Sequence, residues 1–192
     1  QTCALPISAH CEDQETIKNN IEKYKQKYKG ADDIPISAHP SIRSVPACYA
    51  SSELAVRLAK IAGARLHILH VSTAKELQLF SDEPLANKNI TAEACVAHLL
   101  FTLTHYNSLG ARIKCNPAVK RKTDREALRT AVNSGLIDVI ATDHAPHLLS
   151  EKEGGALKAM SGMPMIQFSL VSILELVDEG VFSLETVVQK MR

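Results

Sequence analysis

The chain has 192 residues, of which 45% are apolar and 22% are charged, and its formal net charge is +1. This composition is close to that of an average globular domain, so it excludes a disordered, fibrous or collagen-like protein. The apolar runs are too short to cross a bilayer, and no charged and then apolar leader precedes a cleavage site. We therefore expect a cytoplasmic protein without a membrane partner.

Both ends of the sequence predict a fragment. Residues 1–7, QTCALPI, resemble the translation of a DNA-sequencing adapter, so we interpret them as a non-native leader without functional weight. The sequence then enters a strand directly, and it closes inside a helix with Ser183 as the N-cap and Glu185 in the first turn. We expect residues 8–192 to be one part of a larger domain.

Strand-like and helical segments alternate along the chain. In chain order the expected elements are a strand at Ile7–Cys11, helices at about Gln14–Lys29 and Cys48–Ala62, a strand at Leu66–Val71, a helix opened by Thr73, a strand at Asn89–Cys95, a helix-like stretch at His98–Tyr106, a helix from Thr123 to Ser134, a strand at Ile137–Thr142 and a helix at Met165–Val177. Two capping boxes, Thr73 with Glu76 and Thr123 with Glu126, predict where two of these helices begin.

The repeated order of strand and then helix predicts parallel strands that are joined by helical crossovers. About four such units are expected, which is half of an eight-unit barrel, and the chain is shorter than the roughly 250 residues of a complete barrel. We therefore expect an α/β fold that is a partial (β/α)8 barrel, with residues 8–192 forming about its C-terminal half.

The charged residues and cysteines favour no other class of protein. The basic residues of the first helix belong to a solvated surface and do not predict nucleic-acid binding. They are Lys18, Lys23, Lys25, Lys27 and Lys29. The five cysteines are odd in number and form no CxxC pair, so the sequence predicts neither a disulfide framework nor a structural zinc knot.

Four of the eight histidines lie at or just beyond the C-terminal ends of predicted strands. These are His10, His70, His144 and His147. The loops that follow the strands of a parallel α/β fold converge at that edge, and ligands bind there. Each histidine taken singly could be an isolated polar residue at a strand end. Their recurrence at one edge favours a binding site.

Strand alternation selects among these residues. His67 and His70 are three apart, so they are expected on opposite faces, with His70 directed to the site and His67 packed beneath the flanking helices. Asp143 ends an apolar strand, where a buried carboxylate needs a cation or a hydrogen-bonding partner. His10, His70 and Asp143 come from three strands and suit zinc, which binds imidazole and carboxylate and in catalytic sites keeps a position for water.

Four local motifs raise the specificity of this interpretation. They are Ala9-His10-Cys11-Glu12-Asp13, His67-Ile68-Leu69-His70-Val71-Ser72-Thr73, Lys114-Cys115-Asn116-Pro117 and Ala141-Thr142-Asp143-His144-Ala145-Pro146-His147. In order and spacing the sequence resembles the dihydroorotases, a family of the amidohydrolase superfamily, over nearly the whole chain after residue 7. The resemblance implies a metal-dependent amidohydrolase barrel with one or two zinc ions.

Carried over residue by residue, the resemblance implies that His10 and His70 bind the second metal. It makes Asp143 a ligand of the first metal and the catalytic proton shuttle. Asn116, His147 and Gly162 match positions that contact the substrate. Taken without the family, Asn116 would be a turn residue before proline, His147 a loop histidine and Gly162 a turn before a helix.

Several family features are missing from the chain. The first-strand His-x-His pair, the arginine for the substrate carboxylate and the bridging lysine or aspartate are expected upstream of residue 1. Only His98 remains where the family often has two consecutive histidines, so neither Ala97 nor His98 is given a role. His39 and His105 are expected at the surface or in loops, and Glu93 in a structural hydrogen bond or ion pair.

For the intact enzyme the resemblance implies reversible hydrolysis of dihydroorotate to N-carbamoyl-aspartate in pyrimidine biosynthesis, with the fragment alone inactive. One alternative is another cyclic amidohydrolase, such as a hydantoinase, dihydropyrimidinase or allantoinase. A second is a non-catalytic scaffold subunit for a partner such as aspartate transcarbamoylase, which the retained strand-end ligands disfavour. The expected partner is otherwise a small-molecule substrate, with a homodimer left open.

Overall fold

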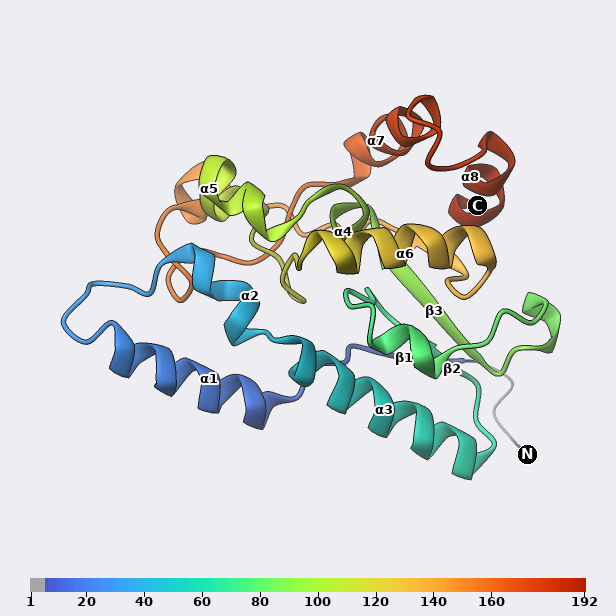
Figure 1. Cartoon of the computed structure of the whole chain (residues 1–192), viewed down its shortest axis with the longest axis horizontal. Helices are drawn as coiled ribbons and strands as arrows, with labels where there is room; N and C mark the ends of the chain where they lie inside the picture. The colour runs from blue at the N-terminus through green and yellow to red at the C-terminus, as the bar shows by residue number, and fades with distance from the viewer. Residues whose placement is uncertain (1–5) are drawn as a thin grey trace.

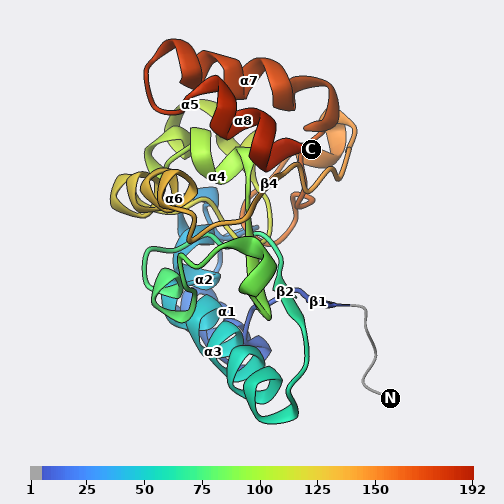
Figure 2. The same ribbon diagram turned by 90° about the vertical axis from the view of Figure 1, so that its right-hand side faces the viewer.

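Four parallel strands form the sheet of the computed structural model, which describes residues 6–192. The strands are β1 (Ile7–Ala9), β2 (Leu66–Ile68), β3 (Ile90–Cys95) and β4 (Val139–Ala141). They lie side by side in sequence order, each parallel to the next. Figure 1 labels β1, β2 and β3, and Figure 2 also labels β4. The expected α/β class with parallel strands is confirmed. Most of the expected leader at residues 1–7 lies outside the described residues, so that division stays a prediction.

Helices join β1 to β2 and β3 to β4, and two more follow β4, whereas only 3-10 turns lie between β2 and β3, where the sequence predicts a helix. The helices are α1 (Gln14–Lys27), α2 (His39–Ile42), α3 (Val45–Ala62), α4 (Val96–Leu100), α5 (Tyr106–Leu109), α6 (Lys122–Ser134), α7 (Ile166–Asp178) and α8 (Leu184–Met191). In both views α1 and α3 lie at one end of the molecule and α7 and α8 at the other, with the strands between them (Figures 1 and 2). None of the described helices is long and apolar enough to cross a membrane.

The two faces of the sheet differ in chemistry. One face carries Ile68, Ala92 and Ile140, which are buried in the main core with apolar residues of α3, α6, α7 and α8. Side chains alternate along a strand, so the register Ser8–His67–Thr91 belongs to the other face. This second face is polar and is only partly buried or exposed. Helix packing therefore fixes the sheet from one side and leaves polar groups on the other.

Only the threonine half of the first predicted capping box forms, and it does not open an α-helix. Glu76 N–H donates to Thr73 Oγ1 at 3.2 Å, and the Thr73 hydroxyl donates to the Glu76 carboxylate at 2.8 Å. The segment that follows is a single 3-10 turn, Glu76–Leu79. Glu76 is buried and also accepts a hydrogen bond from Ser52 of α3 at 2.6 Å, so its side chain anchors the turn to that helix.

The second predicted capping box is wrong. Helix α6 begins at Lys122, so Thr123 already lies in its first turn with an exposed side chain. The group that satisfies the helix start is the Asp124 carboxylate, which accepts from Arg121 N–H at 3.2 Å. Its other oxygen accepts from Ala74 N–H at 3.0 Å. The Asp124 carboxylate thus joins the start of α6 to the segment after β2 and takes the place of the threonine cap. Ala74 is 50 residues away in the chain, so the local sequence pattern does not predict this contact.

The helix-like stretch predicted at His98–Tyr106 is also divided. Helix α4 ends at Leu100, a 3-10 turn occupies Leu103–His105, and α5 begins at Tyr106. The break is held by His105 Nδ1, which accepts from Thr102 N–H at 3.0 Å. The N-cap predicted at Ser183 is confirmed, because its hydroxyl accepts from Thr186 N–H at the start of α8.

Candidate active site at the carboxyl edge of the sheet

Two of the predicted ligands meet directly at the carboxyl ends of β1 and β2. His10 Nδ1 and His70 Nε2 are 2.7 Å apart, and their ring planes are inclined by 73°. At this distance one nitrogen carries a proton and the other accepts it. His70 is buried, whereas His10 is exposed. Burial and the neighbouring His10 ring lower the pKa of His70, so His70 favours the neutral form that binds metals.

Asp143 stands at the corresponding end of β4 and is exposed. Its negative charge acts on His70 and partly offsets the lowering of the His70 pKa that burial and His10 cause. However, no group of three or more histidine, cysteine, aspartate or glutamate side chains within residues 6–192 is placed to hold a metal ion. The structure thus brings His10 and His70 together and does not add Asp143 to their pair.

The surroundings of His10 fit a metal ligand in their chemistry. His10 Nε2 lies 3.4 Å from the buried carboxylate of Glu12, which also pairs with Arg43. Burial alone would raise the pKa of Glu12, but the His10 hydrogen bond and the Arg43 charge outweigh it and hold that pKa below its usual value. Ligand histidines commonly donate their second N–H to a carboxylate. That arrangement leaves Nδ1 of His10 as the nitrogen that faces His70.

The expected position of His67 is wrong. Its ring lies on the polar face of the sheet, where Nδ1 is 2.8 Å from Thr91 Oγ1 and Nε2 is 3.2 Å from Glu93 Oε2. Alternation along β2 does place His67 opposite the core residues, but the strand ends at Ile68. The alternation rule therefore stops before His70, whose φ of 38° turns the chain. Glu93 serves the structural hydrogen bond and ion pair that the sequence predicts.

Asn116 lies where a ligand could satisfy its side chain. Its Oδ1 is buried and has no hydrogen-bond partner, and an unpaired buried acceptor costs about 1–3 kcal/mol. The residue lines a cavity of about 410 Å³ together with Arg43, Lys114 and Ser161. The peptide bond between Asn116 and Pro117 is cis. The position agrees with a substrate contact, which remains a proposal.

Two buried histidines support the segment that carries Asn116. His39 Nε2 donates to the carbonyl of Cys115 and His98 Nε2 to the carbonyl of Pro117, each at 2.9 Å. Burial lowers the pKa of His39 to about 3 and that of His98 to about 4, so both are neutral near pH 7. The expectation of a surface His39 is wrong, because α2 turns this residue into the interior, where it is 2% exposed.

His147 and Gly162 belong to two segments that lie against each other. His147 Nε2 donates to the carbonyl of Ser161 at 3.1 Å, and Ala145 N–H donates to Met163 at 3.0 Å. Gly162 has a φ of 139°, and a Cβ at this position would meet two Ala145 atoms at 2.6 Å. Its N–H donates to Lys114 O at 2.8 Å, which joins this region to the Asn116 segment. Three predicted substrate contacts therefore share one region.

Lys152 holds this region and was not predicted from the sequence. Its buried ammonium group donates to the carbonyls of Lys114, Met160 and Gly162 at 2.9, 2.8 and 2.7 Å. Burial lowers the pKa of Lys152 to about 8. Local sequence offers no signal that separates this lysine from solvated ones, because all three of its acceptors are backbone carbonyls that the fold brings together.

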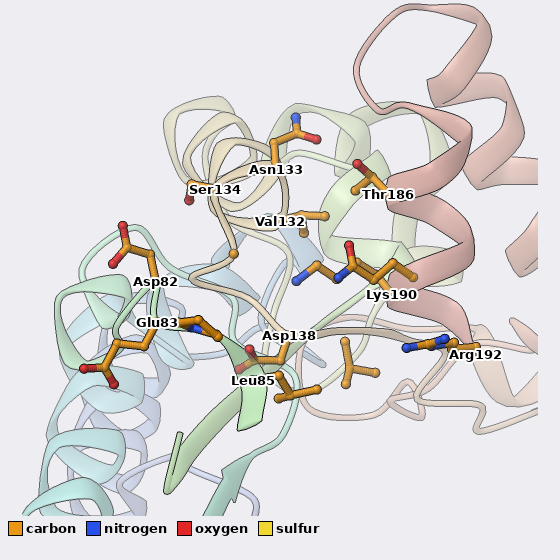
Figure 3. Close-up of a pocket in the computed structure, with 14 residues that line it drawn as sticks. Asp82, Glu83, Leu85, Val132, Asn133, Ser134, Asp138, Thr186, Lys190 and Arg192 are labelled. Atoms are coloured by element: carbon orange, nitrogen blue, oxygen red, sulfur yellow. The ribbon is translucent and has the colours of Figure 1, made fainter. Parts of the chain in front are cut away.

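The pocket of about 340 Å³ in Figure 3 lies elsewhere on the molecule. It is formed by the C-terminal end of α6, by α8 and by the segment before β3, and Asp82, Asp138, Lys190 and Arg192 are among its lining residues. Asp138 immediately precedes β4, so the pocket is at the amino edge of the sheet. In barrels of this kind that edge serves stability and the carboxyl edge serves chemistry.

The relatives found by sequence comparison are dihydroorotases. No protein-family model matches the chain. A dihydroorotase of Endomicrobium trichonymphae is 34% identical over 190 residues, which cover 97% of this chain and 43% of that protein. A dihydroorotase of Staphylococcus epidermidis is 36% identical over 160 residues, which cover 82% of this chain and 36% of that protein. The chain therefore spans less than half the length of these curated relatives.

Solved structures show the same architecture. The L-hydantoinase (dihydropyrimidinase) from Arthrobacter aurescens superposes with a TM-score of 0.87 at 28% identity, over 96% of this chain and 41% of that one. The dihydroorotase of Saccharomyces cerevisiae superposes with a TM-score of 0.65 at 19% identity, over 74% of this chain and 40% of that one. At 19% identity the similarity to the yeast dihydroorotase concerns the fold alone.

The parallel strands and the histidines at their carboxyl edge define part of a barrel of the amidohydrolase superfamily, which confirms the expected fold class. Within that superfamily the chain is a homologue of the dihydroorotases, as its four motifs indicate.

Proposed function

We propose that a full-length protein carrying this sequence is a dihydroorotase, which hydrolyses the cyclic amide of dihydroorotate reversibly to N-carbamoyl-aspartate. The observation that supports this proposal most strongly is the His10–His70 pair, with ring nitrogens 2.7 Å apart at the exits of two adjacent strands. Two converging imidazoles in a homologue of dihydroorotases suit metal-dependent hydrolysis better than a scaffold, which has no need for them.

We assign the metal-holding role to His10, His70 and Asp143. Their imidazole and carboxylate groups are donors that zinc prefers, and Glu12 orients the first of them. Zinc, when bound, would polarise the amide carbonyl and acidify a water molecule towards a pKa of about 7. One or two ions per complete site are compatible with the family.

The proton transfer is assigned to Asp143. Its carboxylate is exposed at the end of β4, so it can reach solvent and substrate alike. In the hydrolytic direction the carboxylate takes the proton of the attacking water and delivers it to the leaving amide nitrogen. Asn116, His147 and Gly162 then supply contacts to the ring, since hydrogen bonds join their segments through Lys114 and Ser161.

A hydantoinase or dihydropyrimidinase activity is the second candidate. It is favoured by the superposition on L-hydantoinase from Arthrobacter aurescens, whose TM-score of 0.87 exceeds the 0.65 of the yeast dihydroorotase. Dihydroorotate carries a carboxylate and hydantoins with apolar substituents do not. Parallel assays of the full-length protein on dihydroorotate, dihydrouracil and hydantoin therefore separate the two candidates, and turnover restricted to hydantoin would contradict the dihydroorotase proposal.

The substitution Asp143→Asn tests the catalytic assignment. The side-chain volume is almost unchanged, but the amide cannot accept the proton, so we expect kcat to fall by at least about 100-fold. The measurement is steady-state hydrolysis of dihydroorotate by the full-length protein with its zinc content determined. Asp178→Asn, at the exposed end of α7, is the matched control and should retain full activity. Near-normal turnover in zinc-loaded Asp143→Asn would remove Asp143 from this role.

A further inference from the structure

The backbone at His70 requires support that the sheet itself does not give. Leu69 N–H donates to Ala9 O of β1 at 3.1 Å, and Val71 N–H donates to Glu93 O of β3 at 2.8 Å. His70 stands between these two ladder bonds with a φ of 38°. This left-handed conformation is uncommon for residues other than glycine and costs on the order of 1–3 kcal/mol. Surrounding groups must therefore hold it.

The side chain of Glu93 supplies that support. Its Oε1 accepts from the backbone N–H of His70 at 3.2 Å, next to the ladder bond that its own carbonyl accepts from Val71. One residue of β3 thus holds two consecutive residues at the exit of β2. The contact fixes the peptide from which the His70 ring projects towards His10.

Glu93 is in turn fixed by a chain of polar contacts along the polar face of the sheet. Its Oε2 lies 3.2 Å from His67 Nε2, and His67 Nδ1 lies 2.8 Å from Thr91 Oγ1. The side chains of His67 and Glu93 are only 17% and 13% exposed, so water competes little for these contacts. The carboxylate therefore has few alternative orientations.

We infer that Glu93, held by His67, which is itself bonded to Thr91, is a positioning residue that turns His70 towards His10 and so sets the geometry of the metal-holding pair. This inference rests on the proposed function, because it assigns His70 to metal binding. Glu93 contacts the backbone of His70, the proposed metal ligand. Its effect should therefore appear first in metal affinity, where removing a group that orients a ligand typically costs 10- to 100-fold.

The test measures zinc affinity, by competition with a chelator, together with kcat and KM on dihydroorotate in the full-length protein. We expect Glu93→Ala to weaken zinc binding at least about 10-fold. Glu93→Gln keeps an oxygen for the His70 N–H and should recover most of the affinity. Glu93→Asp keeps the charge but shortens the side chain by one methylene, so its zinc affinity should fall as that of Glu93→Ala does. It supplies the comparison if Glu93→Ala folds poorly.

Asp124→Ala is the matched control, because Asp124 is also a buried carboxylate that accepts backbone N–H groups, from Ala74 and Arg121, and neither of these is a proposed metal ligand. It should lower the melting temperature without weakening zinc binding. Zinc affinity in Glu93→Ala and Glu93→Asp equal to that of the unmodified protein would overturn the positioning role. An unmodified protein that binds zinc but does not hydrolyse dihydroorotate would contradict the proposed function alone, since the affinity comparison still applies. An unmodified protein that binds no zinc would contradict both.

Discussion

His70 and Asp143 share an uncommon backbone conformation at the carboxyl edge of the sheet. Their φ angles are 38° and 45°, and no other residue except glycine has a positive φ among the described residues. Such strain persists where the surrounding structure over-determines it, and it is concentrated at functional sites. Both residues come from the family motifs, so the strained positions coincide with the candidate site. A change of φ at either residue to a negative value would change the direction of its side chain at the candidate site.

Gly162 allows a tight approach that no other residue permits. We expect Gly162→Ala to destabilise the fold by roughly 2–4 kcal/mol, because the new methyl group would lie 2.6 Å from Ala145 atoms and the φ of 139° is unfavourable for alanine. The same displacement should raise KM for dihydroorotate, since His147 lies beside this glycine. Urea unfolding and steady-state kinetics of the full-length protein measure the two effects.

Gly180→Ala is a control that separates the effect of a positive φ from the effect of a steric clash. Gly180 also has a positive φ, 73°, but no heavy atom lies within 4 Å of its expected Cβ. The control should therefore cost only about 1 kcal/mol and leave KM unchanged. Equal losses of stability in the two variants would mean that the contact with Ala145 has no energetic weight.

At the scale of elements, the start of α6 shows how a tertiary contact determines a helix boundary. Asp124 joins the helix start at Arg121 to Ala74, a residue of the segment after β2. The same carboxylate therefore stabilises a helix and anchors a loop. Thr123, which satisfies the local pattern of a cap, is exposed within the first turn.

Paired substitutions at these two positions test this boundary. Asp124→Ala should lower the free energy of unfolding by about 1–3 kcal/mol, because it removes the cap and leaves the Ala74 N–H without its partner. Thr123→Ala should change it by no more than about 0.5 kcal/mol, as an exposed helical substitution does. Chemical denaturation of the full-length protein gives both values. A larger loss in Thr123→Ala than in Asp124→Ala would restore the threonine cap.

At the scale of the whole molecule, the sheet is open at both sides. Among the described residues β1 pairs only with β2 and β4 pairs only with β3, so their outer edges carry unpaired backbone groups. Large apolar side chains of α7 and α8 are also exposed, including Ile166, Val171 and Val188. The relatives are more than twice as long as the segment they share with this chain.

We therefore expect the 192-residue chain on its own to self-associate and to lack dihydroorotase activity. Open strand edges and apolar surfaces favour intermolecular pairing, and the chain supplies only part of the expected ligand set. Light scattering on the purified, zinc-loaded chain and a hydrolysis assay on dihydroorotate test both statements. A monodisperse monomer that hydrolyses dihydroorotate would show that these residues form a complete enzyme.

The sequence by itself determined the four strands, the long helices, the parallel α/β class and the homology, but not the two short segments that follow β2 and α4. Periodicity and strand–helix order are local properties, so they predicted β1 to β4 and the long helices to within a few residues. Four motifs in fixed order then indicated the dihydroorotases, which the relatives confirm. The convergence of His10 and His70 followed from strand ends alone, because parallel strands place their exits at one edge.

Only the tertiary structure decided which polar side chains are partners. His39 bonds to a carbonyl 76 residues away and Lys152 to one 38 residues away, so no local pattern encodes either contact. The position of His67 on the polar face depended on which face of the sheet the helices cover. The turn of the backbone at His70 depended on the side chain of Glu93. Hydrogen-bond partners depend on distances in the folded chain, whereas periodicity reports only the burial of each segment.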